Sequence, residues 1–255
     1  DPQSASAMYY LGELYRRQGK LEEAIANFEQ ALAIDPSLAE AKLQLSVAYR
    51  DSGDLERAQE IINELATDAT AGPAAVAQAH IRLGAMALEA DDMAEALSQF
   101  RAAKSADPTV VGSYFQLAQI LLQQDKPADA LRQYTAAVEA SPTSAEAHFE
   151  LGKALLRQTD DPYPAIAELE KAVAINPGYV EAYLQLSQAL AQAGQENRAE
   201  VLLNRALKLA QRPELAARAL VQRGELLRLQ GKTRPAANDF QTAIDKDPRN
   251  LAAYI

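Results

Sequence analysis

The chain has 255 residues, of which 48% are apolar and 24% charged, with a formal net charge of −10 and no cysteine. The missing cysteine excludes disulfide scaffolds, cysteine-ligated zinc and thiol catalysis. The acidic balance argues against nucleic acid as a partner, because affinity for nucleic acid comes mainly from lysine and arginine side chains that contact phosphates. No apolar run approaches the roughly eighteen residues that are needed to span a bilayer.

Prolines recur at nearly even intervals. Seven of the twelve are separated by 37, 35, 34, 35, 36 and 35 residues: Pro36, Pro73, Pro108, Pro142, Pro177, Pro213 and Pro248. A fixed period in the thirties is typical of repeat proteins. Alignment on these prolines predicts a single array of repeats over 1–255. In chain order the repeats are 5–38, 39–76, 77–110, 111–144, 145–179, 180–216 and 217–250, with 251–255 as the start of a further one.

Each repeat is expected to hold two helices, because its apolar residues recur at spacings of three and four. The turn between them contains a residue type that tolerates the left-handed conformation ending a helix: Gly19, Gly53, Asp91, Asp125, Gly194 or Gly231. The proline is expected to end the second helix. Extra residues are expected to lengthen two turns between repeats, at Thr67–Val76 and Pro213–Ala216, and one turn within a repeat, at Asp160–Pro164.

The same chemistry recurs at fixed positions of the repeat. Position 20 is always alanine. Position 8 is always small: Gly12, Ser46, Gly84, Ala118, Gly152, Ser187 and Gly224. Position 24 is always large and apolar: Phe28, Ile62, Phe100, Tyr134, Leu169, Leu203 and Phe240. Small residues allow two helices to approach closely, and the large ones fill the space beside them.

This pattern resembles the tetratricopeptide repeat, as in Leu11-Gly12-x2-Tyr15…Ala24-x3-Phe28…Pro36. The resemblance covers 5–250. It implies an all-α fold, a right-handed superhelix of seven antiparallel helix pairs plus a partial eighth repeat. Arg223 departs from the pattern, since leucine is usual there, so the packing of repeat 7 is the least regular. Asp1-Pro2 is interpreted as the end of an earlier repeat, and the chain as part of a longer array.

No residue cluster predicts catalysis. His80 and His148 occupy position 4, where the motif places a bulky packing residue, and they lie two repeats apart. The acidic pairs Asp91-Asp92 and Asp160-Asp161 are interpreted as helix caps and solvated turns. No phosphate-binding loop or hydrolase motif occurs. We therefore expect no enzyme, no cofactor and no bound metal.

The family resemblance places positions 2, 5, 9 and 12 of the first helix on the concave groove. Position 5 is apolar in every repeat, and position 12 is leucine in the middle three. The predicted groove contains Ile81, Leu88, Phe115, Leu122, Phe149 and Leu156, with Gln116, Lys153 and Gln185 beside them, and Arg50, Arg82, Arg157 and Arg228 as flanking cations. Such an apolar surface usually marks a binding site. The alternative is that these residues are buried against the adjacent first helix.

Two further resemblances concern polar positions. Position 6 is glutamine in four of the seven repeats: Gln44, Gln116, Gln185 and Gln222. This resembles the asparagine ladder of the O-linked N-acetylglucosamine transferase superhelix, with glutamine in place of asparagine and three repeats lacking it. Glutamine is also simply common in this chain. The carboxylate clamp of co-chaperone tetratricopeptide domains needs lysine and asparagine at positions 5 and 9, and these are absent.

The leading functional hypothesis is a non-catalytic scaffold that binds a protein or peptide in the groove. The alternatives are a substrate-recruiting arm of a larger enzyme such as a glycosyltransferase, and a periplasmic scaffold of an envelope export or assembly machine. The expected partners include neither nucleic acid nor membrane, and end-to-end self-association is possible through 4–10 and 251–255. The sequence leaves the compartment open between cytoplasm and periplasm.

Overall fold

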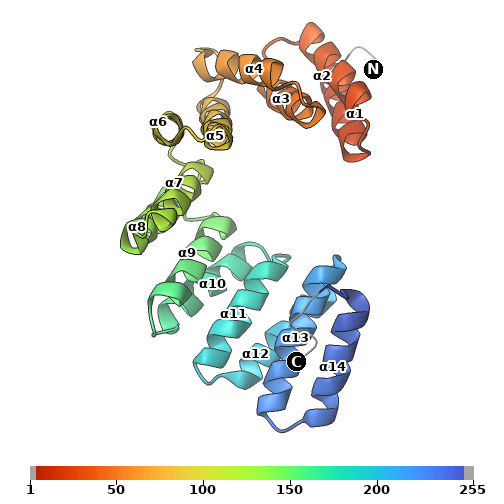
Figure 1. Ribbon diagram of the computed structural model, residues 1–255, viewed down its shortest axis with the longest axis vertical. Coiled ribbons are helices and arrows are strands. Elements are labelled where there is room, and N and C mark those ends of the chain that lie inside the picture. Colours follow the sequence, from red (N-terminus) through yellow and green to blue (C-terminus); the bar gives the residue numbers. More distant parts are fainter. Residues whose placement is uncertain (1–3, 250–255) are drawn as a thin grey trace. The chain divides into compact units, whose positions relative to one another are not determined.

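The computed structural model describes residues 4–249. These residues form fourteen helices and no strand (Figure 1). The helices of repeats 1 to 4 are α1 (Ala5–Arg17), α2 (Leu21–Ile34), α3 (Ala39–Ser52), α4 (Leu55–Thr67), α5 (Pro73–Glu89), α6 (Met93–Ala106), α7 (Gly112–Gln123) and α8 (Pro127–Ala140). Those of repeats 5 to 7 are α9 (Ala145–Gln158), α10 (Tyr163–Ile175), α11 (Val180–Gln192), α12 (Glu196–Leu209), α13 (Pro213–Leu229) and α14 (Thr233–Lys246).

The chain divides between Ile120 and Leu121, inside α7, into two compact units. Unit 1 contains α1 to α6 and most of α7, and unit 2 contains the rest. Within each unit, consecutive helices are joined by short turns and pack as antiparallel pairs (Figure 1). The predicted start of a further repeat at 251–255 and the predicted repeat end at Asp1-Pro2 lie outside the described residues.

The two helices of a repeat touch where position 8 faces position 24. A Cβ atom built on Gly84 would lie 2.5 Å from the ring of Phe100, and one on Gly12 would lie 2.6 Å from the ring of Phe28. The corresponding distance from Gly152 to Leu169 is 2.6 Å. No real Cβ contact is that short, so the absent side chain lets the large residue lie directly on the facing backbone. The predicted pairing of small and large residues is confirmed within repeats.

The turns inside the repeats follow the sequence prediction. All six residues named for the left-handed conformation have positive φ, including the two aspartates, Asp91 at 60° and Asp125 at 56°. Asp92 then accepts a hydrogen bond from the backbone N–H of Glu95 and caps α6. The acidic pair at 91–92 is therefore a turn and a helix cap. At the other pair, the side chain of Asp161 accepts a hydrogen bond from the backbone N–H of Tyr163 in the longer turn of repeat 5.

Two of the aligned prolines do not act as predicted. Pro73 and Pro213 begin α5 and α13, and the preceding helices end earlier, at Thr67 and Leu209. The extra residues of repeats 2 and 6 therefore lengthen α5 and α13 to 17 residues each, instead of lengthening a turn. The physical reason is that proline is favoured in the first turn of a helix, where its missing N–H would have no intrahelical partner.

Repeat 7 replaces the usual leucine with an ion pair. Arg223 donates two hydrogen bonds to Asp239, at 2.7 and 2.6 Å, and a third to the side-chain oxygen of Asn204. Asp239 is only 3% exposed. The hydrogen bonds to Asp239 raise the pKa of Arg223 above its usual value. Arginine is accommodated here because a carboxylate on the facing helix neutralises it.

The contact between positions 8 and 24 predicts a specific mutational coupling. Gly84→Ser should destabilise the protein, because overpacking against Phe100 costs about 1–3 kcal/mol, more than the roughly 0.5 kcal/mol that serine gains over glycine in a helix. The double variant Gly84→Ser/Phe100→Leu reproduces the Ser187 and Leu203 pair of repeat 6. Its loss of unfolding free energy, measured by urea denaturation, should be smaller than the sum of the two single losses. Strictly additive losses would contradict the contact.

A matched control for that experiment is Gly178→Ser. Its nearest neighbour atom would lie at an ordinary 3.4 Å, and the equivalent residue of repeat 1 is already a serine, Ser37. This change should leave the denaturation midpoint unaltered.

The ion pair of repeat 7 gives a second prediction. Arg223→Leu restores the usual residue but leaves the buried carboxylate of Asp239 unpaired, which should cost about 3 kcal/mol. Replacing both residues with leucine should recover most of that loss. The measurement is urea denaturation of the three proteins, and a single variant as stable as the parent would refute the expectation.

Candidate functional site

One surface of each unit is built by the first helices of successive repeats. In unit 1, α1 contacts α3 and α3 contacts α5. In unit 2, α9 contacts α11 and α11 contacts α13. We call this surface the first-helix face of the unit. It carries the positions that the sequence analysis assigned to the groove.

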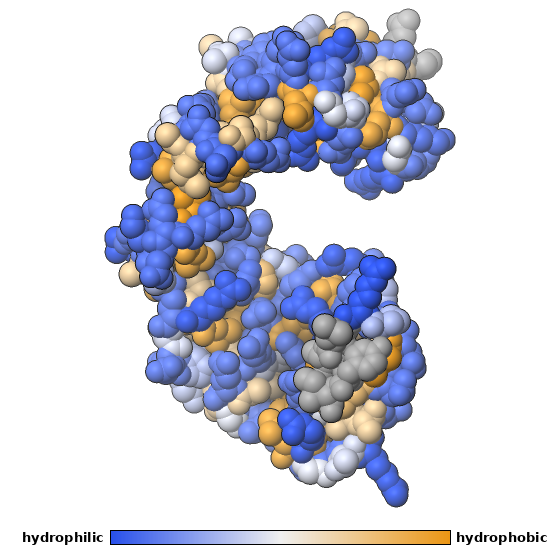
Figure 2. All heavy atoms as spheres, viewed as in Figure 1, coloured by the Kyte–Doolittle hydropathy of each residue, from blue (hydrophilic) through white to orange (hydrophobic). Residues whose placement is uncertain are grey.

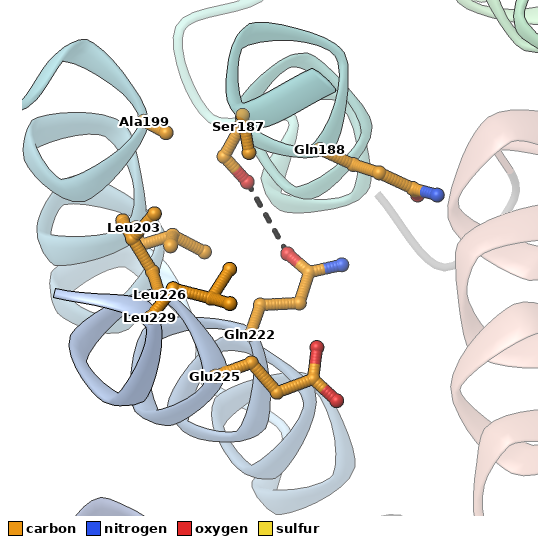
Figure 3. A pocket seen from close by; sticks show the side chains of 9 residues that line it. Ser187, Gln188, Ala199, Leu203, Gln222, Glu225, Leu226 and Leu229 are labelled. Atoms are coloured by element: carbon orange, nitrogen blue, oxygen red, sulfur yellow. Dashed lines mark hydrogen bonds between the residues drawn. The ribbon is translucent and has the colours of Figure 1, made fainter. Parts of the chain in front are cut away.

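A crevice opens on this face between repeats 6 and 7 (Figure 3). Its volume is about 240 Å³. Leu203 of α12 and Leu226 of α13 form an apolar wall. Across the crevice the hydroxyl of Ser187 lies 3.2 Å from the side-chain oxygen of Gln222, to which it can donate a hydrogen bond, while Glu225 lies at the rim (Figure 3). The crevice thus offers an apolar wall and polar groups to one ligand.

An equivalent crevice of about 140 Å³ lies between repeats 4 and 5. It is lined by Leu122 and Tyr134 of repeat 4 and by Glu150, Lys153 and Arg157 of repeat 5. Leu122 is 37% exposed, and its apolar surface therefore meets solvent on this face. The same crevice is almost closed between repeats 2 and 3, where only about 20 Å³ remains.

The three crevices are lined by equivalent positions of the repeat. Each is lined by positions 12 and 24 of one repeat and by positions 6 and 10 of the next. Position 6 differs in charge among them, since it is Arg82, Glu150 or Gln222. Position 10 was not singled out from the sequence, although it follows position 6 by one helical turn and therefore shares its face.

The predicted groove residues differ in exposure. Phe115 is 9% and Phe149 7% exposed, so both aromatic rings are buried. For these two residues the structure agrees with the alternative prediction, in which they are packed inside the array. Phe149 lies 4.8 Å from the ring of Tyr179, and the amino group of Lys153 lies 4.8 Å above the Phe149 ring. The other predicted residues are half-buried, except for the exposed Leu122: Ile81, Leu88, Gln116, Lys153, Leu156 and Gln185. Whether they contact a partner stays a prediction.

The first-helix faces of the two units differ in the charged groups that influence one another. In unit 2, burial and then the neighbouring Glu150 raise the pKa of Glu146. Burial, followed by the carboxylates of Glu146, Glu150 and Glu181, likewise raises the pKa of Tyr179. In unit 1 the corresponding groups are arginines. Burial and then the nearby Arg50 and Arg16 hold the pKa of Arg82 below its usual value.

Both histidines are engaged in structural hydrogen bonds. His80 Nδ1 lies 2.7 Å from the side-chain oxygen of Gln99. His148 is 3% exposed, and its ring nitrogens lie 2.6 Å from Glu168 and 2.9 Å from the carbonyl oxygen of Pro142. Both ring nitrogens of His148 are thus engaged with neighbouring groups, which holds the ring in place inside repeat 5. The predicted packing role of the histidines is confirmed.

The rest of the described surface contains little reactive chemistry. Within 4–249, no three histidine, aspartate or glutamate side chains come together as metal ligands. Over the same residues, no helix has the length and apolar character needed to cross a bilayer. In the view of Figure 2, hydrophilic residues dominate and apolar residues form separate small patches.

Family comparison defines the class of protein. One model of the tetratricopeptide repeat matches residues 15–83 and 164–224, and a second such model matches 115–179. The chain therefore belongs to the tetratricopeptide repeat family, whose members generally serve as scaffolds for protein–protein interaction.

Solved structures share this fold. The chain is similar to MamA, with 24% identity, a TM-score of 0.55 and coverage of 66% of this chain and 95% of MamA. It is similar to YrrB, described as a tetratricopeptide repeat protein with an unusual peptide-binding site, at 20% identity and a TM-score of 0.55 over 70% of this chain and 90% of YrrB. Yeast Tom70 matches 97% of this chain with 51% of its own, at 17% identity and a TM-score of 0.67. A search of curated protein sequences found no match.

The pair of His148 and Glu168 predicts a pH dependence of stability. Burial alone would raise the pKa of Glu168, but hydrogen bonds from Lys171 and His148 outweigh it and hold that pKa below the usual 4.5. A lowered folded-state pKa stabilises the protein above the unfolded value, and this contribution is lost as the pH falls below 4.5 through the folded value. Glu168→Gln should lower the unfolding free energy at pH 7 and flatten its decline on acidification.

The control is Glu170→Gln on the same helix. Glu170 is paired with Arg198 at 2.6 Å, but both side chains are about half exposed, and exposed pairs contribute little. Urea denaturation at neutral and acidic pH should show a much smaller effect for this variant. Equal effects of the two substitutions would contradict the expectation.

Proposed function

We propose that this chain is a non-catalytic scaffold that binds a partner peptide or helix on its first-helix faces. The observation that carries the proposal is the recurring crevice at positions 12 and 24 of one repeat and 6 and 10 of the next. Each crevice joins an apolar wall to polar or charged groups, the combination that anchors a side chain and fixes its orientation.

Both units contribute proposed contact residues. In unit 2, Leu122 and Lys153 line the crevice between repeats 4 and 5, with Leu156 and Gln185 on the same face. In unit 1, the proposed contacts are Ile81, Leu88 and Gln116. The buried rings of Phe115 and Phe149 support the face from beneath.

Two further observations support a binding role. YrrB, a protein of the same fold, is described as having a peptide-binding site. In the described residues, the groups most suited to acid–base chemistry are engaged in packing, as His148 is, or in capping, as Asp92 is. A recruiting arm of a larger enzyme and an envelope scaffold would both use this same surface.

Self-association is a separate proposal. Tyr10 is 66% and Leu14 50% exposed at the first helix of unit 1. These side chains could contact another copy end to end.

The test is selection of peptides from a displayed random library on the purified chain, followed by measured dissociation constants. Leu229 is 75% exposed and lines the crevice between repeats 6 and 7. Variants Leu122→Ser and Leu229→Ser should each weaken the selected peptides that use their crevice by about tenfold, since an apolar anchor contributes 1.5–3 kcal/mol when fully buried and about half of that here. Circular dichroism would verify unchanged helicity.

The matched control is Val201→Ser on α12. Val201 is 66% exposed and lines a different pocket, among α10, α11 and α12. Its substitution should leave the affinities unchanged. The proposal fails if no peptide is selected, or if binding is insensitive to Leu122 and Leu229 but lost with Val201→Ser.

A further inference from the structure

The first-helix face of unit 1 carries three arginines from three successive repeats. Arg16 is at position 12 of α1, Arg50 at position 12 of α3 and Arg82 at position 6 of α5. Arg50 and Arg82 line the same crevice between repeats 2 and 3, where only about 20 Å³ remains. After burial, the charges of Arg50 and Arg16 lower the pKa of Arg82.

Within residues 4–249, Arg16 and Arg82 are half-buried without an ion pair, whereas several other arginines of the chain are paired. Arg198, Arg212 and Arg223 each lie 2.6 Å from a carboxylate. In the described part of the chain, neither Arg16 nor Arg82 forms an ion pair, and the Nε atom of Arg16 is buried without a hydrogen-bond partner. Arg50 contacts only its sequence neighbour Asp51, at 3.5 Å, through a half-exposed side chain.

Half-buried cations without an ion pair are unusual in this protein. In the described residues the other example is Lys104, whose amino group lies 4.3 Å from the centre of the Tyr114 ring. The chain has 35 acidic residues and only 25 lysines and arginines, so carboxylates outnumber their possible partners. A half-buried guanidinium beside two like charges opposes folding, because it loses hydration and is repelled by its neighbours. Such an arrangement is favourable when a bound anion supplies the missing negative charge.

We propose that the arginine cluster of unit 1 recognises an acidic segment of a partner peptide, through side-chain carboxylates of aspartate or glutamate. This inference rests on the proposed peptide-binding function and names the chemistry of its ligand. The planar guanidinium donates pairs of parallel hydrogen bonds to a carboxylate, which gives arginine more specificity than lysine. Because the crevice has little free volume, the carboxylates bind over the guanidinium groups at its mouth.

The position-6 residues make this surface different from the others. Glutamine or glutamate occupies position 6 in five of the remaining repeats: Gln44, Gln116, Glu150, Gln185 and Gln222. On the corresponding face of unit 2, Glu146 and Glu150 lie among the cations, and Lys153 is already paired with Glu150 at 2.8 Å. Acidic recognition is therefore assigned to unit 1.

The test uses the whole chain and two fluorescent peptides of equal length, one with several glutamates separated by glycine and serine, the other with glutamine in their place. The glutamate peptide should bind roughly tenfold more tightly at low salt, and the difference should shrink as salt is added. In NMR spectra, the Nε–Hε signals of Arg16, Arg50 and Arg82 should shift on titration. Equal binding of the two peptides overturns the proposal.

Substitutions separate recognition from folding. Arg82→Gln introduces the residue that four other repeats carry at this position, so it is compatible with the fold. It should weaken the glutamate peptide roughly tenfold while raising the thermal midpoint, because it removes a repelled, desolvated charge. Arg101→Gln on α6 makes the same charge change at an exposed position, and should alter neither. Equal loss of affinity in both variants would reduce the effect to net charge and overturn the proposal.

Two outcomes distinguish this inference from the proposed function. If library-selected peptides depend on Leu122 and Leu229 but the chain binds the glutamate and glutamine peptides equally, peptide binding stands and acidic recognition fails. If inorganic phosphate shifts the same arginine signals at lower concentration than the glutamate peptide, the cluster is a phosphate site and the proposal of a carboxylate ligand is wrong.

Discussion

The close contact between position 8 and position 24 is the constraint on which the rest of this structure depends. Where position 8 is glycine, the ring or branched side chain of position 24 lies directly against the facing helix backbone, as Phe100 does on Gly84. This contact fixes the spacing of the two helices of a repeat. The spacing in turn sets where positions 6, 10 and 12 emerge on the first-helix face, and hence the geometry of the crevices.

Much of this arrangement could be predicted from the sequence because its causes are local. Period, helix pairing and the six left-handed turn residues follow from residue types at fixed offsets, and Asp91 and Asp125 adopt the conformation that glycine takes in other repeats. The same local reasoning misplaced Pro73 and Pro213. Proline can end one helix or begin the next, and the four extra residues of repeat 2 and three of repeat 6 allow the second possibility.

The candidate site was less predictable, because exposure depends on residues far apart in the sequence. An apolar residue at position 5 is compatible either with a solvent-exposed groove surface or with burial between helices. In the structure, Phe115 and Phe149 are buried. The crevices need pairs such as Leu122 with Glu150, contributed by different repeats. Arg223 and Asp239 also lie on two different helices. The sequence therefore showed an arginine where leucine is usual, but it did not show the carboxylate that neutralises this arginine.

Electrostatics distinguishes the surfaces that packing makes alike. Carboxylates surround half-buried Tyr179 in unit 2 around repeats 5 and 6, whereas arginines gather on the equivalent surface of unit 1. Some other arginines in the described chain are neutralised by neighbours, as Arg212 is by Glu181. The chain therefore combines a uniform framework with surface chemistry that changes from repeat to repeat.

Position 6 lies two residues before position 8 and takes no part in the contact with position 24. Evolution can therefore exchange arginine, glutamate and glutamine there by single codon changes without disturbing the interior of the repeat. Gene duplication of a 34-residue unit would copy a ready-made recognition element, and later point mutations would diversify it. A family built this way can acquire new binding preferences one repeat at a time while the packing inside each repeat is inherited unchanged.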